Sequence, residues 1–158
     1  MTSDGLRATA ARVAELLDLA EPDGDPTPEQ RQCFDRAVAA LRAGGPELLD
    51  TLTPHLWEYY RDVEDAVGAD NLGMPPLADD ADIWAHVELP RRPLLMEDGP
   101  DAASPCYVNF EGEVPWEPEH GLQLVFDATG AVCRVGPYTG HLTVSPSILA
   151  AHPGTVYG

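Results

Sequence analysis

The sequence predicts an α+β fold in which N-terminal helices pack on a C-terminal antiparallel sheet built as a meander of hairpins. Apolar residues recur at helical spacing in the first half, and the period changes to two in the last third. Of the 158 residues, 44% are hydrophobic, which is enough for a sizeable core. We expect one domain over residues 1–158, with a helical part at 1–68, a β-rich part at 83–144 and a C-terminal tail at 145–158.

Two helices are expected within the first 45 residues. Apolar residues recur at helical spacing between residues 4 and 20, and the EPDGDP run that follows ends the pattern. Thr27, Pro28 and Gln30 mark the start of the second helix: threonine caps it, proline takes the first helical position and glutamine completes a capping box. The glycine pair at 44–45 ends this helix.

A third helical stretch runs from Pro46 to about Val67. Because Pro54 has no N–H to donate, we expect a kink or a restart there, with Thr53 as the cap. Gly68 is the expected C-terminal cap. The apolar residues beyond the kink have the spacing of one amphipathic face, and they are Leu56, Tyr59, Tyr60, Val63 and Val67.

The middle of the chain connects the two halves. Residues 69–82 are acidic and rich in turn formers, so we expect a surface connection. Residues 82–89 fit either a short helix or the start of a strand, and the pattern does not separate the two. A short strand is expected at 94–96, after two prolines and two arginines.

The last third alternates with a period of two. From Cys106 to Val114 one set of positions is apolar and the other is mostly polar, which predicts a strand with one face in the core and one in water. The alternation returns at 122–126, residues 127–130 supply a turn, and 131–135 is the expected hairpin partner. We expect the helices to cover the apolar face, because a hairpin alone is marginal in water. That face consists of Val108, Phe110, Leu122, Leu124 and Phe126.

Charge limits the classes of partner. The chain has 27 acidic and 9 basic residues, a net charge of −18, and every basic residue is an arginine. This charge argues against nucleic acid and anionic membranes as partners, and the absence of lysine excludes P-loop and Schiff-base mechanisms. Carboxylates concentrate between Glu58 and Asp82 and between Glu97 and Glu119, with aromatic residues among them. That pattern fits a surface for a basic partner protein, and general solubility is the alternative.

The segment from Val114 to Gly121, between two predicted strands, is the candidate site. A carboxylate there can orient or polarise an imidazole, and an indole offers an anchoring face. The alternative is a rigid turn in which the indole covers the sheet edge and the histidine bonds to backbone. The candidate interaction residues of this segment are Trp116, Glu117, Glu119 and His120. The further interaction candidates are Trp57, Tyr60 and Tyr138.

No other chemistry is indicated. The three cysteines are odd in number and widely spaced, and the N-terminus has no basic or apolar leader, so we expect free thiols and a cytoplasmic protein. A zinc site recruiting Cys106, Cys133, His120 and His141 lacks closely spaced ligand pairs, and Cys106 and Cys133 are expected in the core. We therefore predict no metal and no cofactor.

The stretch from Ile83 to His141 resembles a family of uncharacterised bacterial domains. The similarity lies above all in WEPEHGLQLVF (Trp116–Phe126) followed by VGPY (Val135–Tyr138). Members of that family share a similar Trp-Glu-x-Glu-His-Gly pattern before a strand, a turn and a strand, and some resemble the immunity proteins of bacterial toxin systems. The resemblance implies a small cytoplasmic protein and carries no chemistry with it. It leaves the first 45 residues open as a separate binding element.

Together these observations predict a non-enzymatic, acidic interaction protein of immunity type, which binds and neutralises a partner protein with a basic surface, such as a toxin. The alternative function is a small hydrolase or lyase that uses His120 with Glu117 or Glu119 as acid and base. An enzyme needs these groups in a concave pocket, whereas an interaction protein can present them on a convex face.

Overall fold

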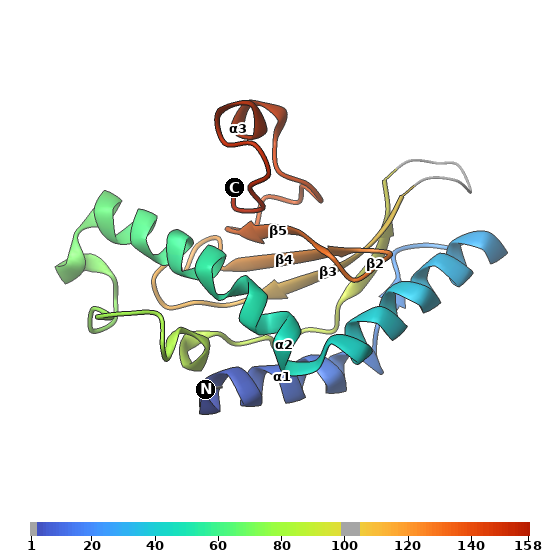
Figure 1. Cartoon of the computed structure of the whole chain (residues 1–158), viewed down its shortest axis with the longest axis horizontal. Coiled ribbons are helices and arrows are strands. Elements are labelled where there is room, and N and C mark those ends of the chain that lie inside the picture. Colours follow the sequence, from blue (N-terminus) through green and yellow to red (C-terminus); the bar gives the residue numbers. More distant parts are fainter. Residues whose placement is uncertain (1–2, 99–104) are drawn as a thin grey trace.

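The computed structural model describes residues 3–98 and 105–158. Asp101, one of the carboxylates of the second acidic run, lies outside the described residues. A long bent helix, α2, crosses one face of a five-stranded sheet, and α1 packs against α2 and the connection that follows it (Figure 1). The predicted α+β architecture is therefore confirmed.

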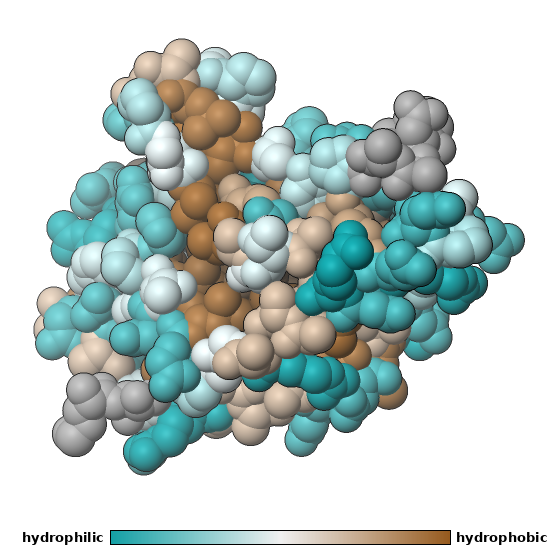
Figure 2. Space-filling view, turned by 45° about the vertical axis from the view of Figure 1, so that its right-hand side comes forward, coloured by the Kyte–Doolittle hydropathy of each residue, from teal (hydrophilic) through white to brown (hydrophobic). Residues whose placement is uncertain are grey.

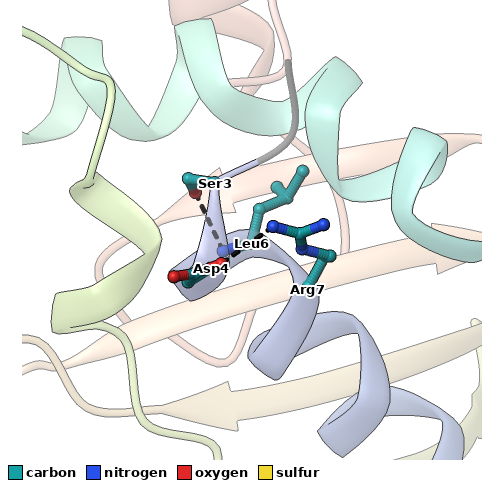
Figure 3. Close-up of polar contacts among 4 residues, drawn as sticks. All are labelled: Ser3, Asp4, Leu6 and Arg7. Atoms are coloured by element: carbon teal, nitrogen blue, oxygen red, sulfur yellow. Dashed lines mark hydrogen bonds and ion pairs between the residues drawn. The ribbon is translucent and has the colours of Figure 1, made fainter.

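Helix α1 spans Asp4–Leu17 and begins at a side-chain cap. The Ser3 hydroxyl accepts a hydrogen bond from the Leu6 N–H at 3.0 Å, and Arg7 pairs with Asp4 at 2.8 Å across the first turn (Figure 3). The apolar residues that predict this helix from the sequence are all buried, and they are Leu6, Val13, Leu16 and Leu17.

Helix α2 spans Pro28–Val67 and contains one break. Its predicted capping box is present, with the Gln30 N–H bonded to Thr27 Oγ1 at 3.2 Å and the Thr27 N–H bonded to Gln30 Oε1 at 2.6 Å. The chain leaves helical geometry at Gly45, whose φ of +55° suits glycine alone, and Figure 1 shows the bend. Gly68 ends the helix, as expected, and donates its N–H to the Glu64 carbonyl.

The predicted restart at Pro54 is wrong. The backbone stays helical through Pro54, and Thr53 caps nothing; its hydroxyl accepts a hydrogen bond from the Trp84 indole N–H at 2.9 Å. Leu52 and Leu56, on either side of the proline, are completely buried. Their burial holds the helix on the core and offsets the roughly 3 kcal/mol that an internal proline costs.

The connection after α2 contains two short 3₁₀ helices, η1 at Ala69–Asn71 and η2 at Ile83–His86. The open choice for residues 82–89 is thus decided in favour of a short helix, which buries Trp84. Glu88 then forms an isolated antiparallel bridge with Glu113.

The sheet has the order β1-β2-β3-β4-β5. Neighbours from β2 to β5 are antiparallel, as expected for a meander, whereas β1 pairs with β2 in parallel and was not predicted. β1 has two residues, too few to show alternation, and tertiary contact alone makes it a strand. The strands are β1 (Glu21–Pro22), β2 (Leu94–Glu97), β3 (Cys106–Gly112), β4 (Leu122–Asp127) and β5 (Val132–Gly136).

The predicted apolar face of the sheet is buried under the helices. Its five residues, listed above, belong to one core cluster with the buried side chains of α1 and α2. Phe110 and Phe126 meet edge to face at 6.0 Å between ring centroids. The first 45 residues contribute to this same core and to the sheet.

The expectation that the other face of the sheet lies in water is wrong. Asn109, Gln123 and Arg134 are buried on it and bond to one another. The segment after β5 covers them: Arg134 donates to the Pro137 carbonyl at 2.7 Å, and Gln123 donates to the His141 carbonyl at 3.1 Å. These polar side chains tolerate burial because they satisfy each other and the backbone above them.

Two of the three predicted free thiols form a disulfide. Cys33 of α2 and Cys106 of β3 are joined, with a Cα–Cα distance of 6.4 Å. They lie 73 residues apart in sequence, so their pairing depends on α2 lying over the apolar face of β3. Cys133 is free, sits beside a β-bulge and is partly exposed, so its expected core position is also wrong. Burial, and then Asp127, raises the pKa of Cys133 to about 11, which leaves little reactive thiolate at neutral pH.

Thiol counting tests this arrangement. The protein, purified without reductant and unfolded in denaturant, should react with one equivalent of a thiol reagent per chain, and with three after reduction. Three reactive thiols before reduction would show that Cys33 and Cys106 are unpaired. The disulfide removes the cysteine-based argument for a reducing compartment.

The C-terminal segment returns to the sheet after helix α3 (Pro146–Ala151), which projects from the body (Figure 1). The Val135 N–H donates to the Val156 carbonyl at 2.7 Å, and Tyr157 forms a parallel bridge with Val135. Figure 2 shows apolar residues in a band that runs from this projection down the body between polar flanks. Across the described ranges, no helix combines the length and the apolar character needed to cross a membrane.

Candidate functional site

The turn between β3 and β4 is held in place by backbone hydrogen bonds. At its start Glu113 exchanges two bonds with Glu88, at 2.8 and 3.0 Å. At its end the Gly121 N–H donates to the Glu117 carbonyl at 2.9 Å. Gly121 has a φ of +63°, and a Cβ there would lie 2.5 Å from the Gly112 carbonyl oxygen, so no other residue fits without a shift. The turn therefore presents its side chains in a defined geometry.

Trp116 points inward from this turn. Its side chain is 3% exposed and meets Tyr59 and Tyr60 edge to face, with ring centroids 5.8 and 5.5 Å away. Its Nε1 has no hydrogen-bond partner within residues 3–98 and 105–158. The sequence left two roles for Trp116, an anchoring face for a partner or a cover for the sheet edge. The geometry fits the second role, because the buried indole offers no surface to a partner.

Glu117 and His120 lie against each other on the outside of the turn. The His120 Nδ1 is 3.5 Å from the Glu117 Oε1, and the two side chains are 57% and 26% exposed. The ligand atoms of Glu117, Glu119 and His120 all lie within 4.8 Å of one another, so these three side chains can approach a single cation. The zinc set considered from the sequence is unavailable, because Cys106 is in the disulfide.

A cavity of about 520 Å³ opens beside the turn. Carboxylates from both sides of the Glu88–Glu113 bridge line it, together with Glu117 and His86. His120 is not among the lining residues, and its side chain is 57% exposed, so the imidazole that would pair with Glu117 or Glu119 lies largely in solvent outside the cavity.

The remaining interaction candidates are separated by the fold. Tyr60 is fully buried; its hydroxyl donates to Glu64 at 2.9 Å and accepts from the Leu77 N–H at 2.7 Å. Trp57 is half-buried, stacked on Tyr60 at 5.0 Å. Tyr138 is exposed and its pKa is raised, first by burial of its hydroxyl and then by Glu111. Trp57 and Tyr138 are thus the aromatic candidates that retain surface.

Tyr59 and Tyr157 connect the turn with α2, and neither stood out as a site residue in the sequence. The Tyr59 hydroxyl donates to the Gly121 carbonyl at 2.6 Å, and its ring lies 6.0 Å from that of Tyr157. Burial raises the pKa of both phenols; Glu117 adds to the rise at Tyr59, and Asp62 adds to it at Tyr157. Tyr59 carried a helical-spacing signal, whereas Tyr157 stands alone in the tail and carried none.

Carboxylates from three segments therefore gather around one part of the molecule. The Tyr59 ring lies 6.0 Å from that of Tyr157, and the Tyr59 hydroxyl bonds to the Gly121 carbonyl at the end of the turn. Asp62 and Glu58 of α2 raise the pKa of Tyr157, Glu117 of the turn raises that of Tyr59, and Glu88 is bridged to Glu113. We call these residues the acidic surface: Glu58, Asp62, Glu88, Glu113, Glu117 and Glu119. Within the described part of the chain, no arginine lines the adjoining cavity.

Comparison with known proteins adds a family. The model of a domain of unknown function, DUF6985, matches residues 13–142, which covers the end of α1, all of α2, the five strands and the β3–β4 turn. No curated protein and no solved structure shows significant similarity to the chain.

Proposed function

This chain belongs to the DUF6985 family, and we propose that it is a non-enzymatic interaction protein whose acidic surface binds a basic partner protein. The observation that carries the proposal is the convergence of carboxylates from α2, from the connection after η2 and from the β3–β4 turn. These segments are far apart in sequence and are linked by the Tyr59–Tyr157 contact, the Tyr59–Gly121 hydrogen bond and the Glu88–Glu113 bridge, so the fold as well as the composition brings their carboxylates to neighbouring positions.

Electrostatics explains how such a surface would act. Exposed carboxylates of one sign raise the local potential and steer an oppositely charged partner, which increases the association rate. Arg134, which acts to lower the pKa of Tyr59, is buried and bonded to Gln123 and Pro137. Arg61 pairs with Glu64 and lies over the Trp57 ring at 5.9 Å. Trp57 supplies an aromatic contact beside the carboxylates.

The proposed mode of action is that of an immunity protein: it occupies a basic surface of its partner, such as a toxin, and thereby neutralises it. A net charge of −18 disfavours nucleic acid and anionic membrane as competing partners. We place this binding in the cytoplasm on the resemblance described above. Because cytoplasmic reductants keep most thiols reduced, the Cys33–Cys106 disulfide counts against this location, and three reactive thiols in the thiol count above would support it.

A second candidate function, a hydrolase or lyase that uses His120 with Glu117 or Glu119, is supported by the 3.5 Å contact between His120 and Glu117. The exposure of His120 and its absence from the cavity lining weigh against it, because general acid–base catalysis needs the proton-transferring group beside a bound substrate. We therefore prefer the interaction protein.

Matched charge variants test the proposal. One variant carries Glu58→Gln, Asp62→Asn, Glu117→Gln and Glu119→Gln on the acidic surface. The control carries Asp23→Asn, Asp25→Asn, Asp35→Asn and Glu47→Gln at other exposed positions. Both change the net charge from −18 to −18 + 4 = −14. The probe is an immobilised peptide of alternating arginine and tryptophan, and its association rate is measured by surface plasmon resonance.

We expect the acidic-surface variant to associate about tenfold more slowly than the parent and the control to change by less than about threefold, since steering depends on local potential. The association rate of the parent protein should decrease as the salt concentration rises from 0.1 to 1 M, because the Debye length shrinks from about 10 to about 3 Å. Equal losses in the two variants would mean that net charge alone attracts the peptide, and the acidic surface would then have no special role.

A further inference from the structure

A second cavity, of about 460 Å³, lies between the C-terminal part of α1 and the segment that leads into β2, and no residue of the acidic surface lines it. Its apolar lining comes from Leu16 of α1, from Leu19 just after the end of α1, and from Pro90 and Leu94. Leu19 is 56% exposed, the highest value among the large apolar side chains of the described residues. We call this cavity the arginine groove, because Arg12, Arg91 and Arg92 line it.

Three of the nine arginines of the chain line this groove: Arg12, Arg91 and Arg92. Such a concentration runs against the charge of a molecule with three times as many carboxylates as cations. The polar lining is completed by Asn109 and Glu111 of β3. The groove is thus the one described cavity with three guanidinium groups around an apolar floor.

The present partners of these arginines leave them able to bind a ligand. Arg91 lies 3.7 Å from Glu111, which is longer than a hydrogen bond, and Arg92 lies 3.1 Å from Glu21; both arginine side chains are more than half exposed. Exposed ion pairs of this kind contribute about 0–1 kcal/mol and exchange partners readily. Arg12 is fixed by a bond to the Leu89 carbonyl at 3.0 Å and contacts Glu15 at 3.1 Å.

We propose that the arginine groove binds a small anionic amphiphile, a molecule with an alkyl chain and a carboxylate head. The chain would lie on Leu19, Pro90 and Leu94, which keep exposed surface, and the head would accept hydrogen bonds from Arg91 and Arg92. A guanidinium group matches the two oxygens of a carboxylate, and apolar pockets of 300–1,000 Å³ with a few polar groups are the usual size for small ligands.

The ligand must carry both parts. An anion without an alkyl chain would have to approach a protein of net charge −18 and would gain only exposed ion pairs. An alkyl chain without the anion would leave the guanidinium groups unused. This proposal does not depend on the partner-protein function, because the groove shares no lining residue with the acidic surface.

Titration with three eight-carbon probes tests the proposal on the full chain: sodium octanoate, 1-octanol and octylamine, each below its micelle concentration or solubility limit. Binding is followed by amide chemical shifts in two-dimensional NMR. We expect saturable binding of octanoate, with shifts centred on residues 12–19 and 90–94, at least tenfold weaker binding of octanol, and no binding of octylamine in the groove.

Two arginine variants separate the groove from general charge. Arg91→Ala with Arg92→Ala should weaken octanoate binding at least tenfold. The control, Arg31→Ala with Arg36→Ala, removes the same charge from exposed positions of α2 and should leave the affinity within twofold. Equal binding of octanoate and octylamine, unchanged affinity in the groove variant, or no saturation by octanoate would each overturn the proposal; the spectra also report whether each variant is folded.

Discussion

Trp116→Ala is expected to lower the free energy of unfolding by about 3–5 kcal/mol, the usual cost of truncating a buried large aromatic side chain to alanine. The indole fills the space between the β3–β4 turn and α2, where it meets Tyr59 and Tyr60 edge to face. Its removal leaves a cavity that the hydrogen-bonded turn and the helix cannot both close, because backbone bonds hold the turn at each end. Chemical denaturation followed by circular dichroism measures the loss.

Trp57→Ala is the matched control. Trp57 stacks on Tyr60 from the outside and is half-buried, so its loss should cost about half as much or less. If Trp116→Ala were as stable as the parent protein, the indole would not be part of the core, and the interpretation of Trp116 as a surface anchor for the partner would then be favoured.

Arg134→Met is expected to destabilise the protein by about 2–4 kcal/mol, because it removes the donors of a buried network while keeping most of the apolar stem. The guanidinium of Arg134 donates to the Gln123 side chain and to the Pro137 carbonyl. After the substitution the Pro137 carbonyl loses this donor in a part-buried site. The Gln123 Oε1 keeps only the longer bond from the Thr139 N–H at 3.3 Å, while the Gln123 Nε2 still donates to Asn109 and to the His141 carbonyl. Each poorly satisfied buried acceptor costs about 1–3 kcal/mol.

The same denaturation assay checks this expectation, with Arg31→Met as the control at an exposed position of α2, which should change stability by less than about 0.5 kcal/mol. A loss for Arg134→Met as small as that of the control would contradict the network. Weakened protection of residues 137–144 in hydrogen exchange should accompany the loss, because Arg134 and Gln123 hold that segment on the sheet.

The sequence by itself determined the features that depend on neighbours along the chain. Thr27 and Gln30 exchange two hydrogen bonds within a single turn, and Pro28 takes the first helical position, so the start of α2 can be predicted from four consecutive residues. The alternation in β3 and β4 specifies which side chains share the core face, and the i, i+3 spacing brings Glu117 and His120 together. Those local rules predicted the α+β architecture and the position of the turn.

Only the tertiary structure decided the features that depend on segments far apart. Polar residues such as Asn109 and Gln123 predict a wet face, and only the return of residues 137–144 across the sheet shows that they are buried and bonded. The Cys33–Cys106 disulfide and strand β1 likewise exist because distant segments meet. The direction of the Trp116 side chain also depends on a distant segment. A proline-rich turn has no periodicity that predicts which way the indole points, and the indole is buried because it packs against Tyr59 and Tyr60 of α2. The local sequence pattern therefore predicts which neighbouring side chains can interact, whereas the burial of a side chain depends on which distant segment covers it.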